Sequence, residues 1–254
     1  MSRLAGKTAI VTGGAKGIGR HYSTALAAAG ARVMIADIVD GKDVVAEIVA
    51  AHGADAAESF TFDVSDEAQV KALVAKTVER FGRIDVLVNN AALYANLKPR
   101  NYDEWDVETF DRVMAINVRG PWLCVKYAAP HMIAQKSGKI VNIASGAPYK
   151  GIPRMLPYVT SKGAMIAFTR SLSRELGQHG INVNTLSPGY ILSDTGLENA
   201  THVEEERIPV RNSRAFKRDA FPEDLTGTLV YLCSADSDFV TGQSIVVDGG
   251  SVNN

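Results

Sequence analysis

The sequence predicts one α/β domain with a doubly wound, mostly parallel, seven-stranded sheet. Short β-branched runs alternate with longer segments of helical periodicity along almost the whole chain, which is the order that successive βαβ crossovers produce. The strand candidates are apolar at nearly every position, as expected when helices cover both faces of a sheet. No internal repeat, low-complexity tract or linker divides the 254 residues, so we expect one continuous domain over 1–254.

Seven strands and six long helices are expected in alternation. The strands span 8–12, 32–37, 59–64, 84–89, 138–144, 181–187 and 244–248. The helices span 17–29, 42–52, 66–81, 108–136, 157–178 and 222–234. Hydrophobic periodicity distinguishes the two classes, and Gly30 and Gly82 end the first and third helices. The segment 190–220 is polar and weakly periodic, so we expect an irregular, lid-like segment there.

Composition and charge limit the classes of partner. Hydrophobic residues make up 46% and charged residues 22% of the chain, which is typical of a globular protein. The formal net charge of -1 creates no field that would attract nucleic acid or an anionic membrane. Cys124 and Cys233 lie in apolar helical stretches, as reduced core thiols do, and the five histidines show no metal-ligand spacing. With no targeting or membrane-spanning segment apparent, we expect a cytoplasmic protein that binds neither metal, nucleic acid nor membrane.

A glycine-rich turn follows the first strand. Thr12-Gly-Gly-Ala-Lys-Gly-Ile-Gly19 joins that strand to the first helix. Glycines at 13, 17 and 19 permit a tight turn and a close approach of backbone to a pyrophosphate, which the helix N-terminus would bind through free N–H groups. A glycine turn alone is weak evidence, because many strand-to-helix turns contain glycine. Here the next strand ends in an acid, and that combination is specific.

Asp37 is that acid, 18 residues after Gly19. Its carboxylate is suited to accept hydrogen bonds from the adenosine ribose hydroxyls. A 2′-phosphate there would meet a like charge, at a cost of about 4 kcal/mol at ~4 Å and an effective dielectric of ~20, which favours NAD over NADP. Lys16 argues in the other direction, because a cation in the turn could pair with a 2′-phosphate. A surface lysine is the alternative for Lys16, so we give Asp37 the greater weight.

Further candidates follow the third and fourth strands. Asp63-Val64 offers an acid beside a backbone N–H that can bind the adenine edge. Asn89-Asn90-Ala91-Ala92 combines asparagines that can lock neighbouring strand ends with alanines small enough for a cofactor to pass. All of these follow the carboxyl ends of strands, the edge at which open α/β sheets bind ligands. The expected cofactor contacts are Gly13, Lys16, Gly17, Ile18, Gly19, Asp37, Ile38, Asp63, Val64, Asn90, Ala91 and Ala92.

Ser145, Tyr158 and Lys162 have a spacing that predicts acid/base chemistry. Ser145 follows the fifth strand, and the i,i+4 spacing of Tyr158 and Lys162 puts a phenol and an ammonium on one helix face. A free tyrosine has a pKa near ~10, and an ammonium at ~4 Å would lower it by about three units. Tyr158 would then exchange a proton with an alcohol while Ser145 holds the substrate oxygen. A surface amphipathic pair is the alternative, and the cofactor motif upstream favours the catalytic interpretation.

Gly120-Pro121 interrupts the helix expected over 108–136. Pro121 has no N–H to donate to the carbonyl of Asn117, four residues earlier. That carbonyl could hold a water and connect Lys162 to solvent, which is a hypothesis based on spacing alone.

Together these motifs resemble the short-chain dehydrogenases/reductases. Thr12–Gly19, Asn89–Ala92, Asn117, Ser145, Tyr158–Lys162 and Pro188-Gly189 occur in the family's order over essentially the whole chain. The resemblance implies a Rossmann-type fold, an Asn117–Ser145–Tyr158–Lys162 tetrad and a homotetramer. It also implies cofactor contacts from Tyr158, Lys162, Pro188, Gly189, Ile191 and Ser193. Two residues depart from the family pattern, because Ala92 replaces a glycine and Ser193 replaces a threonine while keeping a hydroxyl.

The substrate cannot be identified from these motifs. The resemblance implies a pocket lined by Leu93, Tyr94, Ala147, Tyr149, Arg154, Met155, Tyr190 and Leu192, with substrate contacts expected from Tyr94, Ala147, Tyr149, Arg154 and Tyr190. The tyrosines suit a cyclic or aromatic substrate, although ordinary loop packing would explain them equally well. The segment 207–218 contains five basic residues that could pair with an anionic substrate if it closes as a lid. A solvated charged loop is the alternative.

The expected function is hydride transfer between NAD(H) and a small secondary alcohol or ketone, cyclic or aromatic. An NAD-dependent sugar or polyol dehydrogenase, acting on an anionic sugar if the lid binds one, is the first alternative. A 3-oxoacyl-thioester reductase usually requires NADPH, so Asp37 argues against it. A non-catalytic NAD-sensing module is the alternative from another class, and the intact Ser145, Tyr158 and Lys162 argue against it.

Overall fold

The computed structural model describes residues 2–193 and 203–252, and these form a three-layer α/β domain. Within them the sheet has seven strands, all parallel, in the order β3-β2-β1-β4-β5-β6-β7. The strands are β1 (Thr8–Thr12), β2 (Arg32–Asp37), β3 (Ala57–Thr61), β4 (Val86–Asn89), β5 (Gly138–Ile143), β6 (Ile181–Pro188) and β7 (Ser244–Val247). The doubly wound fold and the single domain predicted from the sequence are confirmed.

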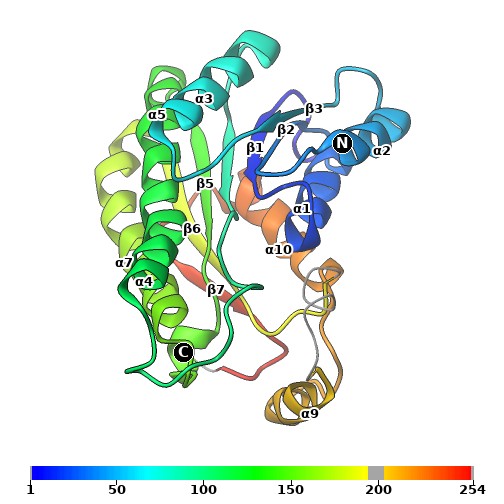
Figure 1. Cartoon of the computed structure of the whole chain (residues 1–254). Helices are drawn as coiled ribbons and strands as arrows, with labels where there is room; N and C mark the ends of the chain where they lie inside the picture. Colours follow the sequence, from blue (N-terminus) through cyan, green and yellow to red (C-terminus); the bar gives the residue numbers. More distant parts are fainter. Residues whose placement is uncertain (1, 194–202, 253–254) are drawn as a thin grey trace.

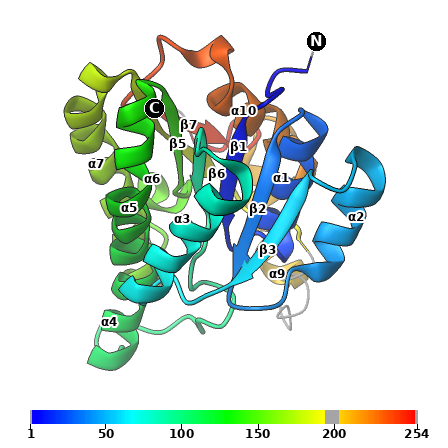
Figure 2. The same ribbon diagram turned by 90° about the horizontal axis from the view of Figure 1, so that it is seen from above.

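The helices flank the sheet on both sides (Figure 1). They are α1 (Gly17–Ala28), α2 (Lys42–His52), α3 (Glu67–Phe81), α4 (Val107–Met114), α5 (Gly120–Gln135), α6 (Ala147–Lys150), α7 (Leu156–Leu176), α9 (Val203–Ser213) and α10 (Glu223–Cys233). Seen from above, α1, α2 and α10 cover one face, while α3, α5 and α7 cover the other (Figure 2). Strand order reverses between β1 and β4, and this reversal opens a crevice at the carboxyl ends of the strands.

Alternate residues of each strand supply two separate cores. In β1, Ala9 and Val11 belong to the cluster that packs against α1, α2 and α10, whereas Ile10 belongs to the cluster under α3, α5 and α7. All three side chains are fully buried. Because both faces are covered, the strands are apolar throughout, which is why they are recognisable in the sequence. Cys124 and Cys233 are buried and unpaired in these cores, as predicted.

Two strand boundaries differ from the prediction. The third strand spans Ala57–Thr61 rather than 59–64, because its partner β2 ends at Asp37, which pairs with Thr61. Beyond Thr61 the N–H of Phe62 still donates to the carbonyl of Asp37, the last residue of β2, at 2.8 Å, and Asp63 and Val64 then lie in the turn that follows. The fourth strand begins at Val86 instead of residue 84.

The helical segment over 107–135 is continuous, and Pro121 does not break it. A π-helical turn, Ala115–Arg119, joins α4 directly to α5. Pro121 is the second residue of α5, directly after this turn, in which the N–H of Gly120 bonds to the carbonyl of Ala115 five residues earlier. Asn117 therefore lies in the π-helical turn, and such turns are frequent at functional sites because they re-aim side chains.

The segment 190–220 is less irregular than predicted, since it contains the helix α9. Residues 194–202 of the expected lid lie outside the described part of the chain. Among residues 2–193 and 203–252, no helix is both long and apolar enough to cross a bilayer.

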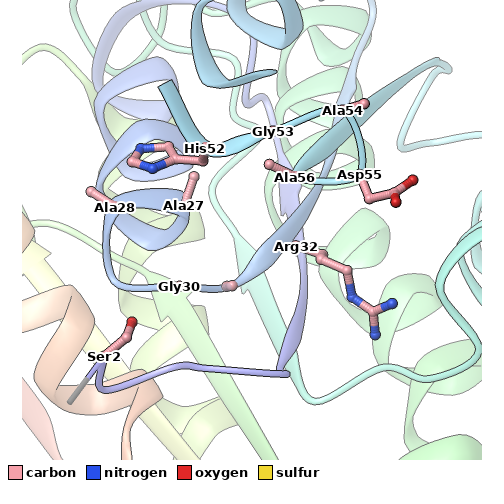
Figure 3. Close-up of a pocket in the computed structure, with 11 residues that line it drawn as sticks. Ser2, Ala27, Ala28, Gly30, Arg32, His52, Gly53, Ala54, Asp55 and Ala56 are labelled. Carbon is pink, nitrogen blue, oxygen red and sulfur yellow. The ribbon is translucent and has the colours of Figure 1, made fainter. Parts of the chain in front are cut away.

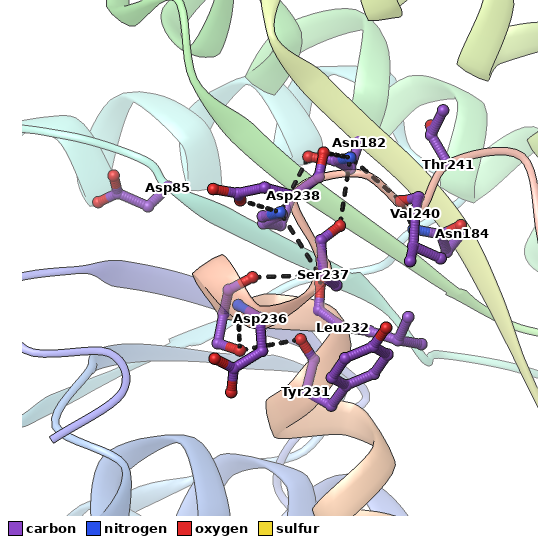
Figure 4. Close-up of polar contacts among 12 residues, drawn as sticks. Asp85, Asn182, Asn184, Tyr231, Leu232, Asp236, Ser237, Asp238, Val240 and Thr241 are labelled. Atoms are coloured by element: carbon purple, nitrogen blue, oxygen red, sulfur yellow. Dashed lines mark hydrogen bonds and ion pairs between the residues drawn. The ribbon is translucent and has the colours of Figure 1, made fainter.

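A polar network at the amino ends of β5 and β6 fixes the segment that leads into β7 (Figure 4). The Lys139 ammonium donates to Asn182 Oδ1 at 2.9 Å and pairs with Asp238 at 2.7 Å. Asn182 and Asn184 both donate to the carbonyl of Val240. This buried lysine is therefore fully partnered, and its network serves the sheet at the edge opposite the crevice.

Candidate active site

The candidate residues gather at the carboxyl edge of the sheet, around the crevice between β1 and β4. An open hollow lined by Ser2, Gly30, Arg32, His52 and Asp55, among others, lies elsewhere (Figure 3). Arg32 is the first residue of β2, so the hollow lies at the amino edge. It therefore plays no part in the site described below.

The glycine-rich turn between β1 and α1 requires glycine at two positions. A Cβ at Gly19 would lie 1.9 Å from the carbonyl oxygen of Gly13, an impossible contact. Gly13 has a φ of 63°, and a Cβ there would lie 2.9 Å from the Cα of Ala91. The turn thus packs backbone against backbone and leaves the first N–H groups of α1 facing the crevice. These features fit a pyrophosphate at the helix N-terminus.

Asp37 at the end of β2 lies directly against this turn. Its Oδ2 accepts a hydrogen bond from the N–H of Ala15 at 2.9 Å, and its Oδ1 accepts from Val39 at 3.3 Å. Each carboxylate oxygen retains a further lone pair for a ligand hydroxyl. Lys16 is exposed at the N-cap of α1, and the Ile38 side chain is 66% exposed beside Asp37. An apolar side chain this exposed at the crevice fits one wall of an adenine subsite.

Asn90 locks the ends of β1 and β4, as the sequence predicts. Its Nδ2 donates to the carbonyls of Thr12 and Gly13, both at 2.9 Å. In return, the Thr12 hydroxyl accepts from the N–H groups of Asn90 and Ala91, at 3.0 and 3.1 Å. Ala92, where the family has a glycine, is exposed. Its methyl group therefore points to the solvent side of the crevice rather than into the core.

Asp63 and Val64 are more constrained than expected. The Asp63 carboxylate accepts from the N–H and hydroxyl of Ser65, and its own N–H donates to Gln69 Oε1 at 2.9 Å. Val64 is buried and packs against Gly120, where a Cβ would lie 2.8 Å from the valine side chain. The pair shapes the turn after β3, and one carboxylate oxygen of Asp63 remains for an adenine contact.

Ser145, Tyr158 and Lys162 come together beside the crevice. Ser145 follows β5, and its hydroxyl hydrogen-bonds with the phenol of Tyr158 on α7. The Lys162 ammonium lies 5.8 Å from the centre of the Tyr158 ring and donates to the carbonyl of Ile143 at 2.7 Å. Tyr158 is half-buried, whereas Lys162 is only 4% exposed.

The pKa values of this pair differ from the prediction. Burial raises the pKa of Tyr158 to about 12, and the Ser145 hydrogen bond offsets only part of this effect. Burial also lowers the pKa of Lys162 to about 8. Desolvation disfavours the charged form of both groups, and for Tyr158 it outweighs the lowering predicted from the ammonium. The positive nicotinamide of an oxidised cofactor is predicted to lower the pKa of Tyr158 in the same direction as the ammonium, and an acidic phenol in the presence of that cofactor stays a prediction.

The side chain of Asn117 hydrogen-bonds to two separate segments of the chain. The amide Oδ1 accepts from the N–H of Leu93 at 2.7 Å, and Nδ2 donates to the Leu93 carbonyl at 3.2 Å and to Ser161 Oγ at 3.0 Å. Asn117 is 1% exposed, so these bonds are shielded from water. The amide therefore ties the segment after β4 to α7.

The turn after β6 borders the crevice from the other side. At Gly189 a Cβ would lie 2.6 Å from the Cβ of Asp248, so glycine is required there. Pro188 and Ser193 are buried, and Ile191 forms an isolated bridge with Ala220. A buried Asp248 oxygen, Oδ2, has no hydrogen-bond partner within the described part of the chain. An orphaned acceptor beside this turn fits a ligand that carries an amide donor.

Two of the expected substrate residues face the acid/base candidate. The Tyr94 ring packs on the Tyr158 ring, with centroids 4.7 Å apart and planes inclined by 43°. Ala147 begins α6, and its N–H donates to Ser145 Oγ at 3.1 Å. Both therefore adjoin the site.

Tyr149 and Arg154 are engaged by the protein itself. The Tyr149 hydroxyl donates to Ser244 on β7 at 2.8 Å, so it does not point a free donor at a substrate. Arg154 has an unusual φ of 64°, and its guanidinium donates to the carbonyl of Pro99. Tyr190 is half-buried, and its carbonyl accepts from Arg214.

Within the described part of the chain, two of the five basic side chains of 207–218 form ion pairs and two more donate to backbone carbonyls. The ion pairs are Arg207–Asp219 and Arg218–Asp224. Arg214, which is 3% exposed, donates to backbone carbonyls, and so does Lys217. Four of the five basic side chains thus have protein partners, which favours a charged segment held by its own contacts over an anion-binding lid.

Several residues at the site were not assigned a role from the sequence. Thr12 lies in the glycine-rich motif and Ser161 lies between Tyr158 and Lys162. Their hydrogen-bond partners are 78 and 44 residues away in sequence. Arg214 and Asp248 meet the turn at Gly189 from still other segments. Only the fold brings these groups together, so no local spacing could have revealed them.

Known proteins resemble this chain over nearly its whole length. Residues 13–252 match the family model described as Enoyl-(Acyl carrier protein) reductase. Galactitol 2-dehydrogenase of Agrobacterium fabrum is 39% identical over 258 residues, covering 98% of both chains. The 2,5-dichloro-2,5-cyclohexadiene-1,4-diol dehydrogenase of Sphingobium indicum is 41% identical over 252 residues, again covering 98% of both. The crystal structure of levodione reductase superposes with a TM-score of 0.89 at 32% identity, covering 97% of this chain and 98% of that one.

These matches extend the resemblance seen in the motifs to the whole sequence and fold. The chain belongs to the short-chain dehydrogenase/reductase family. It is an oxidoreductase that acts on the CH–OH group of donors, and the family implies a nicotinamide dinucleotide as its cofactor.

Proposed function

We propose that this protein is an NAD-dependent dehydrogenase of neutral, cyclic secondary alcohols, with Tyr158 as the acid/base. The observation that carries the proposal is the convergence of Ser145, Tyr158 and Lys162 at the same carboxyl edge of the sheet as the glycine-rich turn. The proposal assigns roles to groups whose geometry is described above, together with the family's chemistry.

In the proposed mechanism Ser145 and Tyr158 bind the substrate oxygen between their hydroxyls. As the phenolate, Tyr158 accepts the hydroxyl proton while the carbinol carbon loses hydride, and the resulting phenol returns that proton in the reverse direction. Lys162 is protonated at neutral pH, since its pKa is about 8, and its charge stabilises the phenolate form of Tyr158. A bound nicotinamide dinucleotide supplies the hydride acceptor and, when oxidised, a positive charge of the kind that lowers a neighbouring phenol's pKa.

Asp37 supports NAD as the preferred dinucleotide. Its carboxylate lies against the glycine-rich turn through Ala15, and no basic side chain pairs with it among the described residues. A 2′-phosphate would have to approach this like charge. The exposed Lys16 in the same turn could offset part of that cost, and we give Asp37 the greater weight because its carboxylate would meet the ribose directly. Gly13, Gly17, Gly19 and Asn90 would shape the pyrophosphate site. Pro188, Gly189, Ile191 and Ser193 would border the nicotinamide.

The surroundings of Tyr158 support a neutral and cyclic substrate. The Tyr94 ring provides an apolar wall next to the phenol, and aromatic walls favour flat or cyclic ligands. The arginines of 207–218 that could attract an anion are largely engaged in internal pairs. The relative that acts on a cyclohexadienediol agrees with this choice.

A polyol dehydrogenase is the second candidate function. It is favoured by the galactitol and sorbitol dehydrogenases, each 39% identical to this chain. The hydroxyl of Ser145 and the partly exposed Tyr190 would serve an open-chain polyol equally well. Asp37 argues against a thioester reductase that uses NADPH, and the complete catalytic set argues against a sensor without activity.

The test is an activity panel with the purified protein. Cyclohexane-1,2-diol, D-sorbitol and galactitol are each supplied with NAD or NADP, and formation of the reduced cofactor is followed by absorbance. The proposal expects the highest kcat/KM with the cyclic diol and NAD. A preference for an open-chain polyol would move the assignment to the second candidate, and a preference for NADP would contradict the role of Asp37. The homotetramer, the cytoplasmic location and a lid over 190–220 remain predictions, of which the first is tested by light scattering.

A further inference from the structure

A closed chain of contacts links α7 to the segment after β4. Ser161 on α7 donates its hydroxyl to the carbonyl of Tyr158 at 2.7 Å and accepts from Asn117 Nδ2 at 3.0 Å. The Asn117 amide holds both backbone groups of Leu93, at 2.7 and 3.2 Å. The next residue, Tyr94, returns to α7, because its ring packs on that of Tyr158. The acid/base candidate is therefore part of the same circuit as its aromatic wall.

Ser161 and the backbone of Leu93 together determine which way the Asn117 amide faces. The only proton of the Ser161 hydroxyl is donated to the Tyr158 carbonyl, so its oxygen can only accept a hydrogen bond from the amide. The amide nitrogen of Asn117 must then face Ser161, and the amide oxygen must face the N–H of Leu93. In the reversed orientation the amide nitrogen of Asn117 would face the N–H of Leu93, which is also a donor. The amide oxygen would face the Ser161 oxygen, which has no proton left to donate.

Burial makes this orientation persistent. Ser161 is 0% and Asn117 1% exposed, so water cannot replace either bond, and a lost partner would leave a buried polar group unsatisfied. Tyr94 lies at the other end of the circuit and is 43% exposed. Its backbone is anchored through its neighbour Leu93.

We propose that Ser161 is a positioning residue that acts through Asn117 and Leu93 to hold Tyr94 against Tyr158. The position of Tyr94 determines the width of the substrate pocket beside the phenol, and thereby the preference for cyclic over open-chain alcohols. This inference rests on the proposed function in one respect, namely that Tyr158 is the acid/base.

The structural test does not depend on activity. The protein is labelled with 3-fluorotyrosine, and the Tyr94 resonance is assigned with Tyr94→Phe. Ser161→Ala should move that resonance towards the position of a free tyrosine. Ser173→Ala is the matched control, because Ser173 is also buried on α7 and also donates to a carbonyl three residues earlier, at 2.8 Å. An unchanged Tyr94 resonance in Ser161→Ala would overturn the proposal.

The kinetic test uses cyclohexane-1,2-diol and D-sorbitol with NAD. Ser161→Ala should raise the KM for the diol about tenfold, the equivalent of one hydrogen bond, and leave the sorbitol KM, the NAD affinity and the pH dependence of kcat unchanged. In a Tyr94→Leu background Ser161→Ala should not change the KM for the diol any further, because both substitutions alter the same aromatic wall of the substrate pocket. An equal effect in both backgrounds would overturn the proposal.

Two further variants keep the outcomes distinct. If Ser161→Ala does not fold, Ser161→Cys replaces it, since a thiol of similar size is a weak acceptor and should give a smaller change of the same kind. If Tyr158→Phe retains activity, the proposed function fails while the fluorine signal still decides the role of Ser161. If Tyr158→Phe is inactive and Ser161→Ala behaves like Ser173→Ala, only the present inference fails.

Discussion

The carboxylate of Asp37 accepts a hydrogen bond from the backbone N–H of Ala15, with an oxygen-to-nitrogen distance of 2.9 Å. The end of β2 thus supports the glycine-rich turn and presents a negative charge beside it. The same carboxylate therefore stabilises the turn and would meet a 2′-phosphate bound beside it as a like charge.

Replacing this charge should change the cofactor preference. In Asp37→Ser the ratio of kcat/KM for NADP to that for NAD should rise at least ~100-fold, since a like charge near ~4 Å costs about 4 kcal/mol. The two ratios are measured by steady-state kinetics with the best substrate of the panel. Asp40→Ser is the control, because Asp40 is a nearby exposed acid that pairs with Lys42. An unaltered ratio in Asp37→Ser would show that the selectivity lies elsewhere.

Removing the phenol oxygen should abolish turnover without loss of binding. Tyr158→Phe should lower kcat by about 10³-fold, within the range typical of a lost general acid/base, while NAD affinity measured by fluorescence titration stays within about twofold of the wild-type value. Tyr127→Phe is the matched control, because that hydroxyl bonds Glu67 at 2.7 Å on the outer surface of α5. Near-native turnover in Tyr158→Phe would refute the mechanism.

The glycine-rich turn should tolerate no side chain at Gly19. A Cβ there would meet the Gly13 carbonyl oxygen at 1.9 Å, so Gly19→Ala must displace backbone. We expect a loss of NAD affinity of at least ~100-fold and a loss of stability of about 2–4 kcal/mol. Gly227→Ala on α10 is the control, since nothing lies within 4 Å of its Cβ, and it should stabilise the helix by about 0.5–1 kcal/mol. Urea unfolding and calorimetric titration measure both quantities.

The sequence reveals the parts of this protein that depend on local spacing. The strands β1 and β2, the turn at Gly13–Gly19 and the pair Tyr158–Lys162 all follow from periodicity or from helical geometry, and the structure has them where expected. The end of β3 was misplaced because the length of a strand depends on its partner β2, which is not a local property.

The remaining features depend on burial and on contacts between distant segments. The π-helical turn at Asn117 requires α7 as a packing partner, and the bond from Asn117 to Ser161 joins residues 44 apart. Spacing predicts only the effect of the ammonium on the pKa of Tyr158, because the sequence does not reveal how strongly burial desolvates the phenol and raises that pKa. Spacing identified the pair, but only the structure gives the dielectric environment that determines its charges.

The buried charge of Lys162 should lower the free energy of unfolding of the protein, although the site requires that charge. The buried Lys162 ammonium donates to the Ile143 carbonyl, and burial lowers its pKa from 10.5 to about 8. A folded-state pKa below the unfolded value means that the charged form is disfavoured in the fold by about 3 kcal/mol. Lys162→Met should remove this cost, lose a hydrogen bond worth about 1–2 kcal/mol, and raise the free energy of unfolding at pH 7 by a net ~1–2 kcal/mol while abolishing turnover.

The advantage of Lys162→Met should depend on pH in a defined direction. Below pH 8 both the folded and the unfolded wild-type chains carry the proton, so the full cost is present. As the pH rises from about 8 to 10.5 the folded chain loses its proton first, so wild-type stability rises and the difference between the two proteins narrows. Lys139→Met is the control, because that buried lysine is partnered by Asn182 and Asp238. Its loss should destabilise by about 1–2 kcal/mol, the contribution of the hydrogen bonds removed, since the Asp238 side chain that remains is 71% exposed. Urea unfolding across this pH range measures all three proteins. Equal destabilisation by the two substitutions would show that the Lys162 charge is not held at a cost, and that the phenol of Tyr158 has a different electrostatic environment from the one described.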